Sequence, residues 1–328
     1  MKKLGKIIVV GGVSGVGKTT ISKLLAKKME LPFYDADDFH PEANVQKMKA
    51  GHALNDADRK PWLLTLARNI SEWENEKGAI LACSALKESY RELLQQGAGR
   101  QIIWIFLEGS EQLIAERLSD RKGHFFDAHL LKSQFEAYKR PSYGFYIDVA
   151  PAPEIIADNI INVLTGKSSF GIMGAGVKGI QLARKLGRQQ LKLSLFDPKP
   201  TESKDSLVAQ QIKKYPELAI AEGFTALSEF VKSIEKPRKI VFMSSPDQTI
   251  NLMKKLEPLL ENADILINVP NIDDGDHNHL IDSLKEKDVR FCIKGNYENW
   301  PNKATINTET PEIWEGFQTI VSFLRKKG

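Results

Sequence analysis

Two segments of the chain repeat the same order of hydrophobic and polar positions. Each begins with a short apolar run, continues through a glycine-rich turn, and ends in a stretch with the hydrophobic spacing of a helix. The first segment covers residues 6–29 and the second covers residues 169–186. A strand, a glycine-rich turn and a helix in this order typically open an α/β domain with a parallel sheet. The pattern therefore predicts two α/β domains.

Further apolar runs and amphipathic stretches follow in both halves. In the first half we predict strands at 32–35, 79–83, 102–107 and 145–149, and helices at 61–76, 87–95, 110–119 and 128–138. In the second half we predict strands at 191–196, 239–243, 265–268 and 289–293. A small polar stretch at 165–169 follows a helical pattern at 154–164. It predicts a boundary between domains at residues 1–166 and 167–328.

Composition narrows the class of protein. The 328 residues are 42% hydrophobic and 27% charged, with a net charge of +4. This small excess is spread along the chain, so we expect no nucleic-acid surface. The two cysteines, Cys83 and Cys292, indicate a reducing compartment and not a disulfide scaffold. Since no apolar stretch approaches the roughly 18 residues that span a bilayer, we expect a cytoplasmic protein without a membrane anchor.

The first glycine-rich turn matches the complete P-loop pattern, G-x-x-x-x-G-K-[ST]. Its backbone N–H groups would surround the phosphates, Lys18 would neutralise their charge, and the Thr19 hydroxyl would ligate Mg²⁺. The sequence has no guanine-reading Asn-Lys-x-Asp motif, which argues against a GTPase. The predicted ATP-binding residues of this turn are Gly12, Val13, Ser14, Gly15, Val16, Gly17, Lys18, Thr19 and Thr20.

An acidic segment follows the second predicted strand. Asp35 and Asp37 alternate in sequence, which would place both on one side of an extended segment. One carboxylate would hold Mg²⁺ through water, and the other would accept a proton from a substrate hydroxyl. We assign Asp35, with Thr19, to the metal and Asp37 to the general base. A solvated acidic loop is the alternative interpretation.

Several further blocks stand out in the first half of the sequence. They are Asp35–Asp37 with His40-Pro41, Asn44 with Lys47-Met48 and Gly51, Leu54–Leu63, Cys83–Lys87 with Tyr90-Arg91, Arg117-Leu118 with Arg121, His124–Phe126, and Leu131–Phe135. Over roughly residues 5–165 these blocks resemble the gluconokinase family. The resemblance implies a P-loop kinase that uses ATP and Mg²⁺ to phosphorylate D-gluconate to 6-phosphogluconate. Two departures are Ala36, where the family usually has Gly, and Arg140-Pro141, where Glu-Pro is common.

Basic residues in these blocks suit an acidic, hydroxylated substrate. Arg59 offers a donor fork for a carboxylate, and Lys87 and Arg91 have the spacing of one helix face. Arg117 and Arg121 have the same spacing, typical of a lid that closes over ATP. We predict Lys18, Asp37 and Arg121 as catalytic, and Arg117 and Arg121 as further ATP-binding residues. The predicted substrate residues are Asp35, Asp37, His40, Arg59, Lys87, Arg91 and His124. A kinase of another small hydroxy acid, similar to shikimate kinase, is the alternative.

The second glycine-rich turn has the dinucleotide pattern G-x-G-x-x-G at Gly174, Gly176 and Gly179. The next predicted strand ends in Asp197, where a ribose-binding acid is expected. Asp197 favours NAD over NADP, but Lys199 nearby leaves NADP open.

Three further blocks lie in this half. They are Gly171–Gly174, an apolar run that ends in Met243–Pro246, and Asp264–Asn268 leading to Asn271. Over roughly residues 169–295 these blocks resemble the coenzyme domain of 6-phosphogluconate dehydrogenase. The resemblance implies a Rossmann-like domain and a nicotinamide contact for Asn271. Val269-Pro270-Asn271 replaces the Gly-Gly-Asn of those enzymes, and Lys294-Gly295-Asn296 replaces their Ser-Gly-Gly. The helical domain with their catalytic lysine has no counterpart, so we expect no complete dehydrogenase here.

The sequence thus predicts an α/β P-loop kinase domain followed by a Rossmann-like domain, in a homodimer. Three roles remain open for the second domain. It regulates the kinase or mediates an interaction, it forms a bifunctional enzyme with a 6-phosphogluconate dehydrogenase-type partner, or it binds no ligand and only mediates oligomerisation. Asp197 and the intact glycines argue against the last role.

Overall fold

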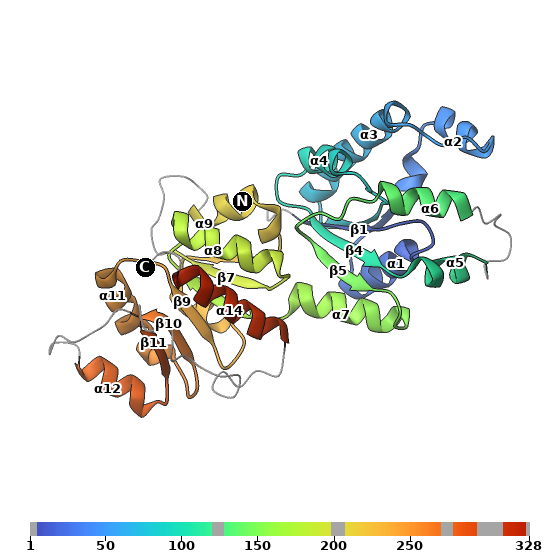
Figure 1. Ribbon diagram of the computed structural model, residues 1–328. Helices are drawn as coiled ribbons and strands as arrows, with labels where there is room; N and C mark the ends of the chain where they lie inside the picture. The colour runs from blue at the N-terminus through green and yellow to red at the C-terminus, as the bar shows by residue number, and fades with distance from the viewer. Residues whose placement is uncertain (1–4, 120–127, 198–206, 270–277, 294–310, 326–328) are drawn as a thin grey trace. The chain divides into compact units, whose positions relative to one another are not determined.

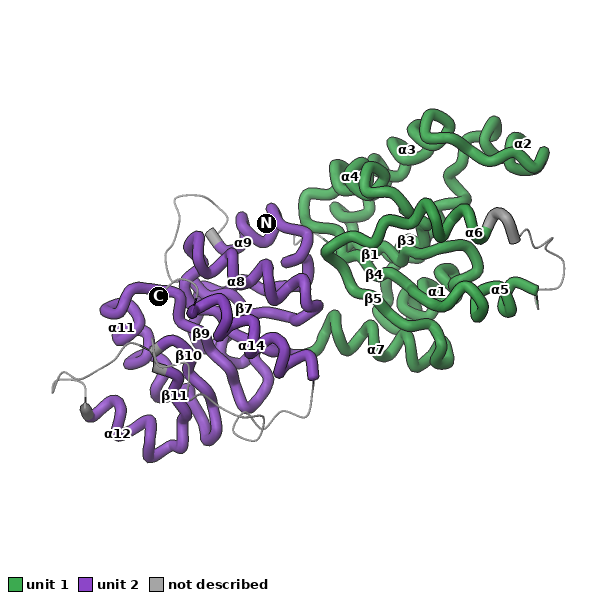
Figure 2. Tube along the Cα trace, viewed as in Figure 1, with its two compact units in different colours: residues 1–166 green, residues 167–328 purple. Residues whose placement is uncertain are grey.

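The computed structural model describes residues 5–119, 128–197, 207–269, 278–293 and 311–325 (Figure 1). The chain divides into two compact units, residues 1–166 and 167–328 (Figure 2). Each unit has its own parallel sheet and its own buried clusters. Among the described residues, no helix combines the length and apolar character that crossing a bilayer requires.

The first unit is a five-stranded parallel sheet in the order β2-β3-β1-β4-β5. Helices α1 and α7 pack together, as do α3 and α4 (Figure 1). The strands are β1 (Lys6–Gly11), β2 (Phe33–Asp35), β3 (Gly78–Ala82), β4 (Ile103–Glu108) and β5 (Phe145–Asp148). The helices are α1 (Lys18–Met29), the 3₁₀ turn η1 (Ala36–Phe39), α2 (Glu42–Lys49), α3 (Asp56–Asn75), α4 (Glu88–Gln96), α5 (Glu111–Ser119), α6 (Ala128–Ala137) and α7 (Pro153–Thr165).

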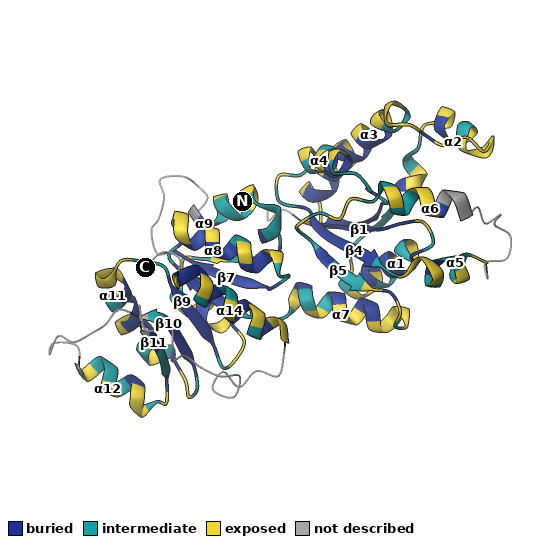
Figure 3. Cartoon of the chain, in the orientation of Figure 1, coloured by how far each residue is buried: buried dark blue, intermediate teal, exposed yellow. Residues whose placement is uncertain are grey.

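The three central strands β1, β3 and β4 are largely buried because helices cover both faces of the sheet, whereas the edge strands β2 and β5 are partly exposed (Figure 3). Ile7 and Val9 of β1 pack with Leu66 of α3. Helix α3 begins at Asp56, five residues before the predicted start. The Asn55 side chain accepts a hydrogen bond from the Asp58 backbone N–H, and the Asp58 carboxylate accepts one from that of Asn55. This capping box fixes the start of the helix upstream of the proline at position 61.

The second unit is a six-stranded parallel sheet in the order β11-β10-β9-β6-β7-β8. This is the doubly wound order of dinucleotide-binding folds, with the switch point between β6 and β9. The strands are β6 (Phe170–Met173), β7 (Leu193–Phe196), β8 (Glu222–Phe224), β9 (Lys239–Phe242), β10 (Ile265–Val269) and β11 (Arg290–Ile293). The helices are α8 (Val177–Arg188), α9 (Leu207–Lys214), α10 (Leu227–Lys232), α11 (Pro246–Leu256), α12 (Asn278–Glu286) and α14 (Pro311–Arg325), with 3₁₀ turns η2 (Pro216–Leu218) and η3 (Glu257–Leu259).

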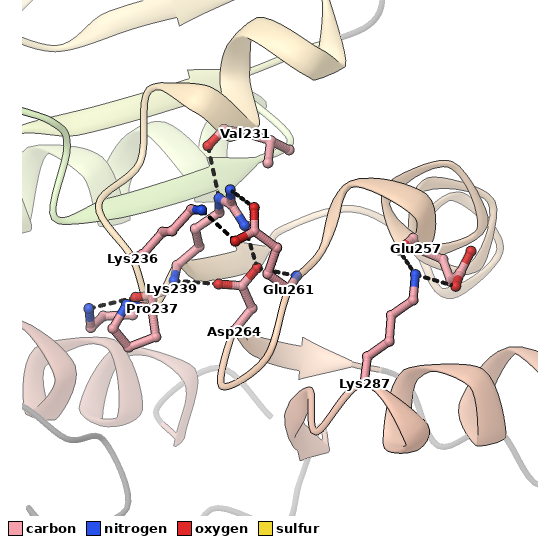
Figure 4. A network of polar contacts seen from close by, with 9 residues as sticks. Val231, Lys236, Pro237, Lys239, Glu257, Glu261, Asp264 and Lys287 are labelled. Carbon is pink, nitrogen blue, oxygen red and sulfur yellow. Dashed lines mark hydrogen bonds and ion pairs between the residues drawn. The ribbon is translucent and has the colours of Figure 1, made fainter.

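An ion cluster with a buried pair, Arg238 and Asp264, joins the start of β9 to the start of β10 (Figure 4). Arg238 Nη1 donates to Asp264 Oδ2 at 2.7 Å, and Arg238 Nη2 donates to Glu261 Oε1 at 2.9 Å. Lys236 also pairs with Glu261. Asp264 further accepts the backbone N–H groups of Arg238 and Glu261. Because Asp264 is 1% exposed, these bonds compensate for the burial of its charge.

Candidate active site

The P-loop lies between β1 and α1. Gly12, Gly15 and Gly17 all have positive φ angles, of 134°, 80° and 103°. A Cβ atom on Gly12 would come within 2.7 Å of the Leu107 carbonyl oxygen, and one on Gly15 would come within 2.5 Å of the Leu118 side chain. Only glycine therefore fits the turn that leads into α1. The helix start and the N–H groups of the loop form a site suited to phosphate.

The structure brings the two predicted metal residues together. The Thr19 hydroxyl donates a hydrogen bond to Asp35 Oδ2 at 2.9 Å. Lys18 Nζ donates to the Val13 carbonyl at 2.9 Å, across the P-loop. Hydroxyl and carboxylate oxygens are ligands that Mg²⁺ accepts, and Mg²⁺ usually keeps water and substrate phosphates as its other ligands. The described residues form no cluster of three or more acidic, His or Cys ligands, which a phosphate-bound Mg²⁺ does not need.

The structure corrects the geometry predicted for Asp37. Strand β2 ends at Asp35, and Asp37 lies in the turn η1, where its backbone N–H donates to Asp35 Oδ1 at 3.2 Å. The two residues therefore do not alternate along an extended segment, because the Asp35 side chain caps the turn. Desolvation by the surrounding protein raises the pKa of Asp37, the Asp35 carboxylate raises it further, and Lys18 and His40 lower it. Its side chain is 86% exposed, so this desolvation is partial.

His40 lies close to Asp37 and is itself buried. Its side chain is 5% exposed, and Nε2 lies 3.9 Å from Asp37 Oδ1. The imidazole stacks on Trp62 with 4.3 Å between ring centroids, and Asn44 Nδ2 lies 3.3 Å from His40 Nδ1. Burial lowers the pKa of His40, and Arg59 lowers it further, while Asp37 raises it. The net shift of the His40 pKa is downward, which favours the neutral ring.

Arg59 and Lys87 lie beside an acidic residue that the sequence analysis did not single out. Lys87 Nζ donates to both oxygens of Asp56, at 2.7 and 2.8 Å, and the Tyr90 hydroxyl donates to the same carboxylate. Arg59 Nη1 donates to the Leu54 carbonyl at 2.6 Å, and its guanidinium carbon lies 5.9 Å from the centroid of the Tyr90 ring. Hydrogen bonds from Lys87 and Tyr90 hold the pKa of Asp56 below its usual value.

The structure does not support the predicted role of Arg91 as a substrate-binding residue. It is 1% exposed, and its guanidinium donates to Glu88, the Tyr143 hydroxyl and three backbone carbonyls. These bonds use every N–H group of the side chain. The predicted shared face also fails, because α4 begins at Glu88, so that Lys87 only caps the helix. Arg91 therefore joins α4 to the segment before β5 and leaves no donor for a substrate.

Part of the predicted lid, including Arg121 and His124, lies outside the residues that the structure describes. Arg117 Nη2 donates to the Val149 carbonyl, at the end of β5, at 2.7 Å. Gln134 of α6 was not predicted, yet its Oε1 accepts the Ser14 backbone N–H of the P-loop at 2.7 Å. Its place in the Leu131–Phe135 block of the resemblance was the only signal for it in the sequence.

The second glycine-rich turn has the geometry of a dinucleotide cradle. Gly174 has a φ of 102°, and a Cβ atom on Gly179 would come within 1.9 Å of the Gly174 carbonyl oxygen. A Cβ atom on Gly176 would meet nothing within 4 Å, so this position faces open space at the start of α8. Asp197 is buried directly after β7. These residues fit the pyrophosphate and ribose of a dinucleotide. Lys199 and Asn271 lie outside the described residues.

The fold and the site define the first unit as a P-loop kinase of a small molecule. A family described as "Shikimate kinase" matches residues 14–160. A "Probable gluconokinase" of Dictyostelium discoideum is 41% identical over 172 residues, which cover 48% of this chain and 86% of that protein. The "Thermoresistant gluconokinase" of Escherichia coli (strain K12) is 37% identical over 167 residues, which cover 49% of this chain and 95% of that protein.

Through this unit the chain belongs to the gluconokinase family. A crystal structure of a gluconokinase from Sinorhizobium meliloti 1021 is 36% identical, covers 48% of this chain and 90% of that chain, and has a TM-score of 0.44. The second unit matches a different family, described as "NAD binding domain of 6-phosphogluconate dehydrogenase", over residues 169–295. The predicted α/β fold, with a P-loop kinase and a Rossmann-like domain, is confirmed.

Proposed function

We propose that the first unit transfers the γ-phosphoryl group of ATP to D-gluconate, forming 6-phosphogluconate. The observation that carries this proposal is the contact between the P-loop and the acidic segment, through Thr19 and Asp35 at 2.9 Å. It brings the phosphate-binding residues to the side of Asp37. The similarity to proteins named gluconokinase supports D-gluconate as the acceptor.

In the proposed reaction, each group of site residues has a role that follows from its chemistry. The P-loop N–H groups and Lys18 bind the phosphates, and Thr19 and Asp35 hold Mg²⁺, which supplies charge neutralisation when it is bound. Asp37 accepts the proton of the attacking hydroxyl, since its raised pKa makes it a better base than an ordinary aspartate. Arg59 binds the gluconate carboxylate. Lys87 orients Asp56, which binds substrate hydroxyl groups.

A coupled ADP-release assay with D-gluconate and related sugar acids tests this function. We expect turnover that depends on D-gluconate and Mg²⁺. Turnover with shikimate or another hydroxy acid, and none with D-gluconate, would instead favour the alternative kinase. The purified full-length chain is the enzyme to use, with no added dinucleotide.

We propose that the second unit binds NAD or NADP at Gly174–Gly179 and regulates the kinase or mediates an interaction. The open space at Gly176 and the buried Asp197 support dinucleotide binding. Two alternatives remain for this unit. It forms a bifunctional enzyme with a dehydrogenase-type partner, or it only mediates the formation of a homodimer. Adding 6-phosphogluconate and NADP to the chain together with a purified 6-phosphogluconate dehydrogenase-type partner, and following NADPH absorbance, tests the bifunctional alternative. The partner without the chain is the control, and we expect the chain to add no signal above it.

A further inference from the structure

Asn44 is buried beside the candidate acceptor site and was not among the predicted site residues. It lies on α2, is 6% exposed, and its Nδ2 makes two contacts. One hydrogen of this amide nitrogen is donated to the Asp58 backbone carbonyl at 2.9 Å. The other points to His40 Nδ1 at 3.3 Å. Since a backbone carbonyl only accepts, the Asp58 carbonyl fixes which end of the Asn44 amide is the NH₂ group.

This amide orientation determines the tautomer of His40. An NH₂ group only donates, so His40 Nδ1 must be the acceptor and its ring proton must be on Nε2. The ring cannot turn away easily, because it stacks on Trp62, whose Nε1 donates to the Ala36 carbonyl at 2.7 Å. Ala36 belongs to η1, the same turn that carries Asp37. A ring whose Nδ1 accepts a hydrogen bond carries only one N–H group and is therefore neutral.

The fixed tautomer presents a donor on the side of the ring that faces Asp37. His40 Nε2 and Asp37 Oδ1 are 3.9 Å apart, too far for a direct hydrogen bond. This separation allows one oxygen atom to lie within hydrogen-bond distance of both groups. Such an oxygen accepts from His40 Nε2–H and donates its own proton to Asp37. With the other tautomer, two acceptors would face each other, and no hydroxyl group would be oriented.

We propose that Asn44 is a positioning residue that holds His40 in the Nε2–H tautomer, so that His40 orients the acceptor hydroxyl of the substrate toward Asp37. The inference rests on the proposed kinase function. Its outcome is separable from that function, because the tautomer is measured in the enzyme without substrate.

The first test is ¹⁵N NMR of the histidine-labelled full-length chain, with His40 assigned from the spectrum of His40→Gln. We expect the wild-type His40 signal to show a protonated Nε2 and an unprotonated Nδ1. A wild-type spectrum with the proton on Nδ1 would overturn the inference without any variant.

The second test replaces the donor by an acceptor. In Asn44→Asp the carboxylate favours a proton on Nδ1, so we expect the tautomer to change and kcat to fall about tenfold or more, with the KM for ATP unchanged. Asn44→Ala removes the constraint, and we expect a mixture of tautomers with a smaller loss of kcat. The control is Gln46→Glu, the same change of amide to acid at an exposed position of α2. We expect this variant to change neither the His40 tautomer nor kcat.

Two results separate this inference from the proposed function. A changed tautomer with unchanged kcat in Asn44→Ala would overturn the positioning role and leave the kinase function intact. A wild-type chain that does not turn over D-gluconate would overturn the proposed function, whereas its NMR spectrum would still decide whether Asn44 fixes the tautomer.

Discussion

The acceptor side of the kinase site depends on how individual charged residues are neutralised or left accessible. Asp35 is engaged by the Thr19 hydroxyl, whereas the Asp37 carboxylate remains largely exposed next to Lys18 and His40. Arg91 has the opposite character, with a charge fully enclosed by five partners. Accessible charge with a raised pKa is typical of catalytic groups, and enclosed charge is typical of structural ones.

We predict that Asp37→Asn lowers kcat by about 10²–10⁴-fold, the usual contribution of a general base. The amide cannot accept the proton, but it leaves Lys18 and the P-loop unchanged, so ATP binding should persist. The measurement is turnover in the coupled assay together with ATP affinity by calorimetry. Asp38→Asn, one residue further along the same turn, is the control and should keep its turnover. Near-normal turnover of Asp37→Asn would exclude this residue as the base.

At the scale of elements, a hydrogen bond from the Ser14 N–H to Gln134 connects the P-loop to α6. We predict that Gln134→Ala raises the KM for ATP about fivefold, as expected when a bond of about 1 kcal/mol is lost. The KM rises because, without this hydrogen bond, α6 no longer holds the P-loop in place. Steady-state kinetics at saturating D-gluconate measures the change, with Lys132→Ala on the exposed side of α6 as control. An unchanged KM would mean that the contact has no part in ATP binding.

The ion cluster at β9 and β10 makes the stability of the second unit dependent on pH. Hydrogen bonds from Lys236 and then Arg238 lower the pKa of Glu261 from 4.5 to about 2. A lowered pKa means that this stabilisation is complete above pH 4.5 and is lost as the pH falls toward 2. We therefore predict that Glu261→Gln is less stable than wild type at pH 6 and that the difference shrinks in acid.

Urea unfolding of both chains at a series of pH values measures this difference. Glu229→Gln, at an exposed position of α10, is the control for the loss of one negative charge. A stability difference that stayed constant down to pH 2 would contradict the role given to Glu261.

The elements also show what the sequence can and cannot predict. Helix α1 ends at Met29, where the first repeated segment of the sequence was predicted to end, because Glu30 takes a left-handed conformation there. Strand β8 was missed because it has three residues, none of them buried, and no apolar alternation. Arg91 was misassigned because spacing on a helix does not tell which face is buried. Asn44 lies in a block of the resemblance, but its role was not predicted, because that role depends on the Asp58 carbonyl, which only folding brings near.

At the scale of the whole molecule, the kinase relatives correspond to one unit only. The Escherichia coli relative is covered over 95% of its length by 49% of this chain, so it has no counterpart of the second unit. The first unit, which has its own sheet and buried cluster, thus contains the parts that such a kinase needs. We infer that the second unit adds to a complete kinase and does not supply a missing piece of it.

We predict that residues 1–166 alone keep the kcat and KM of the full chain measured without a dinucleotide.

We also predict that NAD or NADP stabilises the full chain, by about 2.7 kcal/mol at a hundredfold excess over Kd, and changes its kinase kinetics. Gly176→Ala is the decisive variant, because its Cβ meets no protein atom within 4 Å but would obstruct a pyrophosphate. It should unfold like wild type without ligand and lose both effects of the dinucleotide. Thermal unfolding and the coupled assay measure both effects. Stabilisation without a kinetic change would favour an interaction module, and no stabilisation by either dinucleotide would favour a domain that only mediates oligomerisation.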